Sequence, residues 1–287
     1  MKNILVIGST GMLGKPVTNE LIKAGFTVTL LARNIDKTEK LFPGTRVMKG
    51  DIFDITTLTK AMEGMDIVYV NLSIPQASRE KDPQPEREGV DNIITAANQA
   101  GIKKLAYLSS LIKNYQGMNG FNWWAFRIKQ SAVDKIKASG ISYTIFYPST
   151  FMETFPFQMM RGNNIMMLGK SEAPMWFIAA EDYGRQVVAA FRKDGNENKE
   201  FSIQGPEPFT FDEAAKVMTD NYKKTKLKVM KAPIGLLKYI GNFIPKLNYG
   251  ANICEALNKY PEKFESDSAW RELGKPTIFL AEYAKSL

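Results

Sequence analysis

The sequence predicts an α/β fold in which a doubly wound parallel sheet is followed by a smaller, mostly helical C-terminal lobe. Three observations support this class. Short segments rich in Val, Ile and Leu alternate with helical patterns through the first two thirds of the chain. A glycine-rich turn directly follows the first apolar segment. Beyond Gly205-Pro206 helical patterns dominate.

The alternating segments define the expected elements in order. Strands are expected near residues 3–7, 26–32, 46–49, 66–72, 104–109 and 141–146, with another near 200–203. Helices are expected near 13–24, 35–41, 55–62, 85–100, 122–138 and 181–193, then near 212–222, 233–244 and roughly 248–260. Apolar strands joined by helices imply a parallel sheet covered on both faces and wound right-handedly.

The pattern changes after Tyr147, where residues 148–176 become rich in Met and Phe. We therefore expect residues 1–147 and 177–204 to form the sheet domain. Residues 148–176 and 205–287 are then expected to form the second lobe. In sheets of this kind ligands bind beyond the carboxyl ends of the strands, so the cleft between the two lobes is the predicted site.

Composition excludes several kinds of chemistry. The chain of 287 residues has no histidine, which removes imidazole bases, histidine triads and histidine-ligated metals, so no metal site is expected. Cys254 is the only cysteine, which rules out an internal disulfide and favours the cytoplasm. No apolar run is long enough to cross a bilayer, and Met1-Lys2-Asn3 leads straight into the first strand without a signal peptide.

The glycine-rich turn is Gly8-Ser9-Thr10-Gly11-Met12-Leu13-Gly14. It follows the apolar run 4–7 and opens a helical pattern, which is the order of a Rossmann-type phosphate site. The glycines allow backbone angles and close approach that a Cβ would forbid. The first turn of the helix offers unpaired amides and the positive end of its dipole to phosphate oxygens. The turn therefore predicts binding of a dinucleotide pyrophosphate.

The end of the second strand indicates which dinucleotide is bound. Sites that prefer NAD usually carry a carboxylate there, but this strand ends in Ala32-Arg33-Asn34 and the first carboxylate is Asp36. Arg33 offers a charged fork of donors to a 2′-phosphate, and Lys37 adds to the same field. NADP(H) is therefore expected in preference to NAD(H), although Arg33 is alternatively an ordinary solvated arginine.

The other strand ends supply further cofactor-binding candidates. Asp51-Ile52 borders the expected adenine, with Asp51 either accepting from its amino group or capping a turn. Asn71-Leu72-Ser73 either runs beside the ribose and pyrophosphate or is a plain loop. The remaining candidates on this edge are Ser109, Ser110, Tyr147 and Pro148.

Charge adds little about partners. The net charge of +8 is compatible with nucleic acid or anionic lipid, but the lysines are spread along the chain. We interpret it as a solvated basic surface that also attracts an anionic cofactor, with no nucleic-acid partner. Residues 233–247 carry an apolar stripe that could lie on a membrane, but such a stripe more often packs on its own domain, so no stable insertion is expected. A monomer or homodimer is expected.

Several motifs occur in a familiar order: Gly8–Gly14, Arg33, Gly50-Asp51-Ile52, Tyr107-Leu108-Ser109-Ser110, Lys129, and Tyr147-Pro148-Ser149-Thr150-Phe151-Met152-Glu153. Together they resemble the atypical short-chain dehydrogenase/reductases, specifically the NmrA-like NAD(P)-binding group. The resemblance implies a Rossmann domain with a small C-terminal lobe and a substrate cleft between them. It also implies one of two activities: reduction of quinones, carbonyls or activated double bonds by NADPH, or nucleotide sensing without turnover.

In catalytic relatives a tyrosine donates the proton and a lysine four residues later holds the nicotinamide ribose. Lys129 matches that lysine, although it is alternatively a solvated helix lysine beside Arg127, and Ala125 stands at the tyrosine position. Leu111 follows the two serines where such enzymes often carry another hydroxyl. Tyr115 and Tyr147, expected in loops at the ligand edge, are the remaining candidates for the proton donor, and the alternative for each is a packing residue. A quinone acceptor tolerates this loss, because water or Lys129 suffices to protonate its reduced oxygen.

Aromatic residues suggest the nature of the substrate. Trp123 and Trp124, with Phe151 and Phe155, are expected to form a flat apolar wall near the nicotinamide. The alternatives are core between the lobes or a subunit interface. The sequence thus predicts an NADP(H)-dependent oxidoreductase acting on a small hydrophobic acceptor, with a non-catalytic NAD(P)-sensing regulator as the rival hypothesis.

Overall fold

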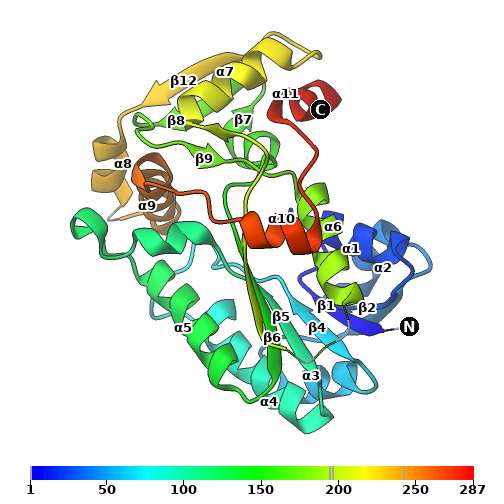
Figure 1. The fold of residues 1–287 in the computed structure, drawn as a ribbon. Helices are drawn as coiled ribbons and strands as arrows, with labels where there is room; N and C mark the ends of the chain where they lie inside the picture. The colour runs from blue at the N-terminus through cyan, green and yellow to red at the C-terminus, as the bar shows by residue number, and fades with distance from the viewer. Residues whose placement is uncertain (1, 194, 196, 242) are drawn as a thin grey trace.

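The computed structural model describes residues 2–193, 195, 197–241 and 243–287, and its centre is a seven-stranded parallel sheet (Figure 1). The strand order is β10-β6-β5-β4-β1-β2-β3. The bounds are β1 Asn3–Ile7, β2 Thr27–Ala32, β3 Arg46–Lys49, β4 Ile67–Val70, β5 Lys104–Leu108, β6 Ser142–Pro148 and β10 Lys199–Ile203. Because the chain returns from β3 to the other side of β1, the ends of β1 and β4 flank the point where the strand order reverses. The predicted fold class is confirmed.

Helices cover both faces of this sheet (Figure 1). Ile4 and Val6 of β1 belong to the core shared with α1 (Gly14–Lys23), α6 (Ala180–Arg192) and α10 (Asp267–Leu273). The alternate residues Leu5 and Ile7 belong to the core on the other face, with α3 (Ile55–Met62), α4 (Val90–Ala100) and α5 (Trp124–Ala138). Burial on both faces explains why the strand sequences are continuous apolar runs.

Local sequence sets the ends of several helices. Asp54 accepts from the backbone amides of Thr56 and Thr57 and so begins α3. Gly101, with φ of 68°, ends α4. The predicted helix 85–100 begins as the π-helical turn η1 (Pro85–Gly89) before α4. The predicted helices 35–41 and 55–62 coincide with α2 (Ile35–Leu41) and α3, and those that correspond to α1, α5 and α6 differ only at their termini.

The C-terminal lobe contains short strands that the sequence pattern does not predict. A three-stranded sheet joins β7 (Met160–Arg161), β8 (Asn164–Leu168) and β12 (Lys228–Ala232), and β9 (Met175–Trp176) pairs with β11 (Pro208–Phe209). The helices of this lobe are α7 Phe211–Asn221, α8 Ile234–Gly241, α9 Pro245–Lys259 and α11 Leu280–Ser286, whereas α10 packs on the sheet domain. The side chains of β12 are mostly exposed, so its sequence carries no alternating apolar signal.

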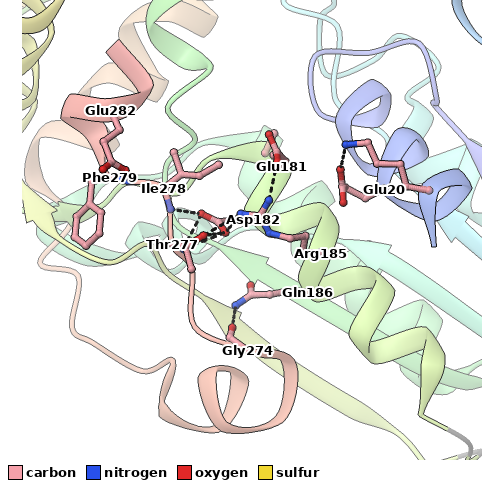
Figure 2. Close-up of polar contacts among 12 residues, drawn as sticks. Glu20, Glu181, Asp182, Arg185, Gln186, Gly274, Thr277, Ile278, Phe279 and Glu282 are labelled. Atoms are coloured by element: carbon pink, nitrogen blue, oxygen red, sulfur yellow. Dashed lines mark hydrogen bonds and ion pairs between the residues drawn. The ribbon is translucent and has the colours of Figure 1, made fainter. Parts of the chain in front are cut away.

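The C-terminal segment is tied to α6 through a buried carboxylate, as Figure 2 shows. Asp182 accepts from the amides of Thr277 at 3.0 Å and Ile278 at 2.8 Å, and it also pairs with Arg185. Gln186 donates to the carbonyl of Gly274 at 2.7 Å. These bonds fix the connection between α10 and α11 against the sheet domain.

Over the described ranges, no helix is long and apolar enough to cross a membrane.

Candidate functional site

The glycine turn brings two backbone segments too close together for side chains. Gly8 has φ of 86°, and a Cβ there would lie 2.0 Å from the carbonyl oxygen of Asn71, at the end of β4. A Cβ on Gly14 would lie 2.0 Å from the carbonyl oxygen of Gly8. Gly11 is less constrained, since its Cβ would meet that oxygen at 3.5 Å. Gly8 and Gly14 therefore close the turn directly beside the reversal point of the sheet.

The Ser9 hydroxyl and the uncapped start of α1 leave this turn with donors for a ligand. No side chain caps the start of α1, and the buried hydroxyl of Ser9 has no hydrogen-bond partner in the described structure. A helix N-terminus without a cap and a buried free hydroxyl are suited to phosphate oxygens. Thr10 is exposed beside them. The residues present therefore fit the pyrophosphate of a nicotinamide dinucleotide.

Arg33 is exposed immediately after β2 and makes no ion pair with any described residue. Asn34 caps α2 by accepting from the amide of Lys37 at 2.9 Å, which places Lys37 in the first turn of that helix. Asp36 is exposed on the same turn. A guanidinium and an ammonium thus stand at the strand end where an adenosine ribose is bound in such folds.

The ends of β3 and β4 contain backbone contacts as well as side chains. Asp51 accepts from the amide of Phe53 at 3.0 Å, so the expected turn-capping role is present in the structure. Ile52 packs against Gly89, where a Cβ would lie 2.9 Å from its Cδ1. Asn71 donates its amide to Ile7 at 3.0 Å. Residues 71–73, including Leu72 and the exposed Ser73, form a loop after β4.

Four polar atoms after β5 are buried without a partner in the part of the chain described. They are the hydroxyls of Ser109, Ser110 and Tyr115 and the indole nitrogen of Trp123. Buried polar atoms are normally satisfied, so such a group marks a region that a ligand or water completes. Pro148 ends the neighbouring strand β6 and is buried.

Lys129 is held by a buried carboxylate. Its Nζ lies 2.5 Å from Oε1 of Glu86, and the Tyr107 hydroxyl donates to the same oxygen at 2.5 Å. The Glu86 side chain is fully buried, whereas that of Lys129 is 17% exposed. Ala125 lies one turn earlier on α5 and is buried. The ammonium is thus positioned by Glu86, and the interpretation of Lys129 as an ordinary solvated lysine does not describe its surroundings.

The expected positions of the two candidate tyrosines are wrong. Tyr115 ends η2 (Leu111–Tyr115) and is fully buried, rather than lying in a loop at the ligand edge. Tyr147 belongs to β6, and its hydroxyl donates to Glu200 at 2.6 Å. Burial, together with Glu200, raises the pKa of Tyr147. Tyr147 lies in β6 because this strand continues to Pro148, beyond its expected end at residue 146, and Tyr115 lies in a 3₁₀ turn that the sequence pattern does not predict.

Two cavities adjoin this region. The tryptophan cavity, of about 510 Å³, is lined by Trp123, Trp124, Arg79, Glu80 and Tyr249, among others. The methionine cavity, of about 490 Å³, lies between η4 (Phe155–Met159), the β7–β8 hairpin and α9. Its wall includes Met159, Met166, Met167, Ile253 and Leu257. Each is large enough for a drug-sized ligand.

The methionine cavity adjoins the glycine turn. Gln158 on its wall has its amide nitrogen 4.0 Å from the sulfur of Met12. Gln76, from the loop after β4, and Thr154, from the segment after β6, also line it. These three residues lie beyond the carboxyl ends of sheet strands, so the cavity opens on the edge where the cofactor-binding candidates gather.

The predicted aromatic wall is divided between cavity and core. Trp123 and Trp124 line the tryptophan cavity, with ring centroids 6.5 Å apart. Phe151 packs on Tyr183 in one core cluster, and Phe155 packs on Phe177 in another. The alternative interpretation, core between elements, therefore describes both phenylalanines. Among the described side chains, no group of three or more His, Cys, Asp or Glu residues could hold a metal ion.

A family profile described as NAD(P)H-binding matches residues 8–194, from the glycine turn through the sheet domain. The chain belongs to the NAD(P)H-binding atypical short-chain dehydrogenase/reductase family. Within this family, a (4-alkanoyl-5-oxo-2,5-dihydrofuran-3-yl)methyl phosphate reductase from Streptomyces griseus is 29% identical over 209 residues, which cover 72% of this chain and 69% of that protein.

Solved structures confirm the same fold. Triphenylmethane reductase from Citrobacter sp., complexed with NADP(H), superposes with a TM-score of 0.76 at 20% identity, covering 99% of this chain and 100% of that one. An NADPH-dependent quinone oxidoreductase from Escherichia coli, complexed with NADPH, gives 0.72 at 21% identity and covers 99% of both chains. At these identities the likeness concerns the fold alone.

Several residues near the site escaped sequence reasoning. Glu86 lies 43 positions from Lys129, and no local motif announces their pairing. Tyr249 of α9 lines both cavities and packs edge-to-face on Trp123 with centroids 5.0 Å apart. Burial raises the pKa of Tyr249 to about 12, with a smaller contribution from the charge of Glu86. Such long-range neighbours leave no periodic signal in a single sequence.

Proposed function

We propose that this family member is a reductase that uses NADPH to reduce a small hydrophobic acceptor such as a quinone. The observation that carries the proposal is the contact between Gln158 of the methionine cavity and Met12 of the glycine turn. Because Gln158 lines the cavity and Met12 lies in the glycine turn, this contact supports a site in which the nucleotide turn and the apolar cavity adjoin. The similar proteins described above, a furanylmethyl phosphate reductase, a triphenylmethane reductase and a quinone oxidoreductase, support reduction of a small organic acceptor.

The chemistry requires little from the protein beyond binding. Bound NADPH supplies a hydride, and with one added proton a quinone becomes a hydroquinone while NADPH becomes NADP⁺. Ser9 and the start of α1 bind the phosphates, while the Glu86–Lys129 pair holds an ammonium on α5. Ala125 and Leu111 leave the usual tyrosine and serine positions without hydroxyls. A quinone suits such a site, because solvent or Lys129 provides the proton without a dedicated acid.

The turnover experiment follows NADPH absorbance across a panel of quinones and enals, alongside calorimetric titration of the nucleotide. We expect NADPH to bind and to be oxidised faster with at least one quinone than in the protein-free control. Nucleotide binding without turnover on any acceptor would instead support the rival hypothesis of a nucleotide-sensing regulator. Absence of any heat from NADPH or NADP⁺ would contradict both.

We further propose that NADP(H) is preferred over NAD(H) through Arg33, assisted by Lys37. Arg33→Ala is expected to weaken NADPH binding about tenfold, because a charge-assisted bidentate contact to the 2′-phosphate is lost, and to change NADH binding less than about twofold. Arg46→Ala is the matched control, since Arg46 is an exposed arginine at the amino end of β3, whereas Arg33 follows the carboxyl end of β2. Equal losses for the two nucleotides in Arg33→Ala would refute the assignment.

A further inference from the structure

The methionine cavity carries a charge pattern that its apolar wall does not explain. Its lining contains two cationic side chains, Arg161 and Lys246, and no Asp or Glu among the residues described there. The tryptophan cavity differs, because Arg79 and Glu80 line it together and Glu80 pairs with Arg127 at 2.8 Å. The positive charge is therefore a property of one cavity rather than of the whole cleft.

Neither cation of the methionine cavity is neutralised within the described structure. Arg161 closes the β7–β8 hairpin, and the only hydrogen bond from its guanidinium to a described residue is to the carbonyl of Met160, at 2.7 Å. Lys246 is exposed and forms no ion pair with a described residue. It lies in the first turn of α9, whose start has no side-chain cap. A cation there opposes the helix dipole, so a bound anion would be stabilised by both.

We propose that the methionine cavity selects acceptors that combine an apolar body with one acidic group, a carboxylate, sulfonate or phosphate. Met159, Met166 and Met167 provide an adaptable apolar surface for the body. Arg161 and Lys246 bind the acidic group at the solvent side. Cationic acceptors are disfavoured, since no lining carboxylate balances the two charges. This inference deepens the proposed reductase function and rests on it for turnover, but not for binding.

The test compares two probes with similar bodies, 1,4-naphthoquinone-2-sulfonate and the neutral 2-methyl-1,4-naphthoquinone. In Arg161→Gln/Lys246→Gln we expect KM for the sulfonate to rise about tenfold relative to the wild type, because two charge-assisted contacts are removed. KM for the neutral quinone is expected to change less than about twofold. Each variant is compared with the wild type on the same probe, so differences in intrinsic reactivity cancel.

The control is Lys224→Gln/Lys226→Gln, which removes the same charge from exposed lysines of the same lobe that do not line the cavity. It is expected to leave both KM values unchanged. The affinity for NADPH is measured in parallel. An equal change for both probes, an equal effect of the control, or a tenfold loss of NADPH affinity in Arg161→Gln/Lys246→Gln would overturn the proposal, the last by assigning the cations to the cofactor.

Binding separates this proposal from the reductase function. Tryptophan fluorescence of the NADP⁺-loaded protein is titrated with each probe, without any turnover. Tighter binding of the sulfonate than of the neutral quinone, lost in Arg161→Gln/Lys246→Gln, supports the anion site even if no quinone is reduced. Equal affinity for the two probes in the wild type refutes it, whatever the outcome of the turnover experiment.

Discussion

The glycine turn and the methionine cavity lie side by side, but they are built in different ways. The turn is made of closely packed backbone, because a Cβ on Gly8 or on Gly14 would lie 2.0 Å from a carbonyl oxygen. The cavity is made of side chains from η4, the β7–β8 hairpin and α9, among them the methionines Met159, Met166 and Met167. A site of rigid backbone tolerates little change, whereas an adaptable apolar wall tolerates many substitutions. We expect nucleotide binding to be sensitive to single residues and acceptor binding to depend mainly on charge.

The largest expected effect lies on the sheet side, at the Glu86–Lys129 pair. Lys129→Met leaves the fully buried Glu86 carboxylate without its cation, which is expected to lower the free energy of unfolding by about 3 to 5 kcal/mol. Urea denaturation measures it. The double variant Lys129→Met/Glu86→Gln removes the unpaired charge and is expected to recover roughly half of the loss. An unchanged stability in Lys129→Met would show that the lysine is an ordinary surface residue.

The next effect tests the rigidity of the turn. Gly14→Ala places a Cβ 2.0 Å from the Gly8 oxygen and 2.9 Å from its carbonyl carbon, so the backbone must move. We expect NADPH affinity to fall by more than about a hundredfold, or about 3 kcal/mol. Gly235→Ala is the matched control, since a Cβ there meets nothing within 4 Å and the residue lies in α8, outside the nucleotide-binding turn. Calorimetry that found similar losses for both variants would remove the distinction between a rigid turn and an adaptable cavity.

An effect that is smaller per residue concerns two carboxyls at the junction between sheet and lobe. Glu262 accepts from Gln204 at 2.7 Å and Ser149 at 2.8 Å, beyond the ends of β10 and β6, and burial raises its pKa to about 7 against these hydrogen bonds. Glu153, which accepts from the amide of Ala180, has its pKa raised to about 7 by the same cause. In a chain without histidine, these two carboxyls titrate near neutral pH.

The sign of the resulting pH dependence follows from the direction of the shift. Between about 4.5 and 7 the unfolded chain has released a proton that the native carboxyl keeps, so the free energy of unfolding falls as pH rises. From pH 5 to pH 8 each group contributes a decrease of about 2 to 3 kcal/mol. Glu153→Gln/Glu262→Gln is expected to flatten the curve, and Glu63→Gln, an exposed control at the end of α3, to leave it unchanged. A wild-type stability that rises over this range would contradict the assignment.

The comparison also explains which parts of the site a single sequence predicts. The strands and helices of the sheet domain, the glycine turn and Arg33 are local features, and each carries its own signal of period, turn chemistry or position. The partner of Lys129 is not local, because Glu86 comes from η1 and meets α5 only in the folded chain. Arg161 and Lys246 are similarly brought to one cavity by a hairpin and a helix, although the two residues lie 85 positions apart in the chain. Chemistry assembled from distant segments leaves no pattern in either segment.

The bonds made by Asp182 have a consequence for how the polypeptide can be divided. The family match ends at residue 194, and the last strand of the main sheet ends at Ile203. Yet the Asp182 carboxylate accepts hydrogen bonds from the backbone amides of Thr277 and Ile278, and the Gln204 side chain donates to Glu262. A chain cut after residue 204 would retain every β-strand of the nucleotide-binding sheet. It would leave the Asp182 carboxylate and the Gln204 amide without their hydrogen-bond partners, on a newly exposed surface. The sheet domain is therefore not a module that can be excised, because residues near the C-terminus supply hydrogen bonds that hold α6 in place.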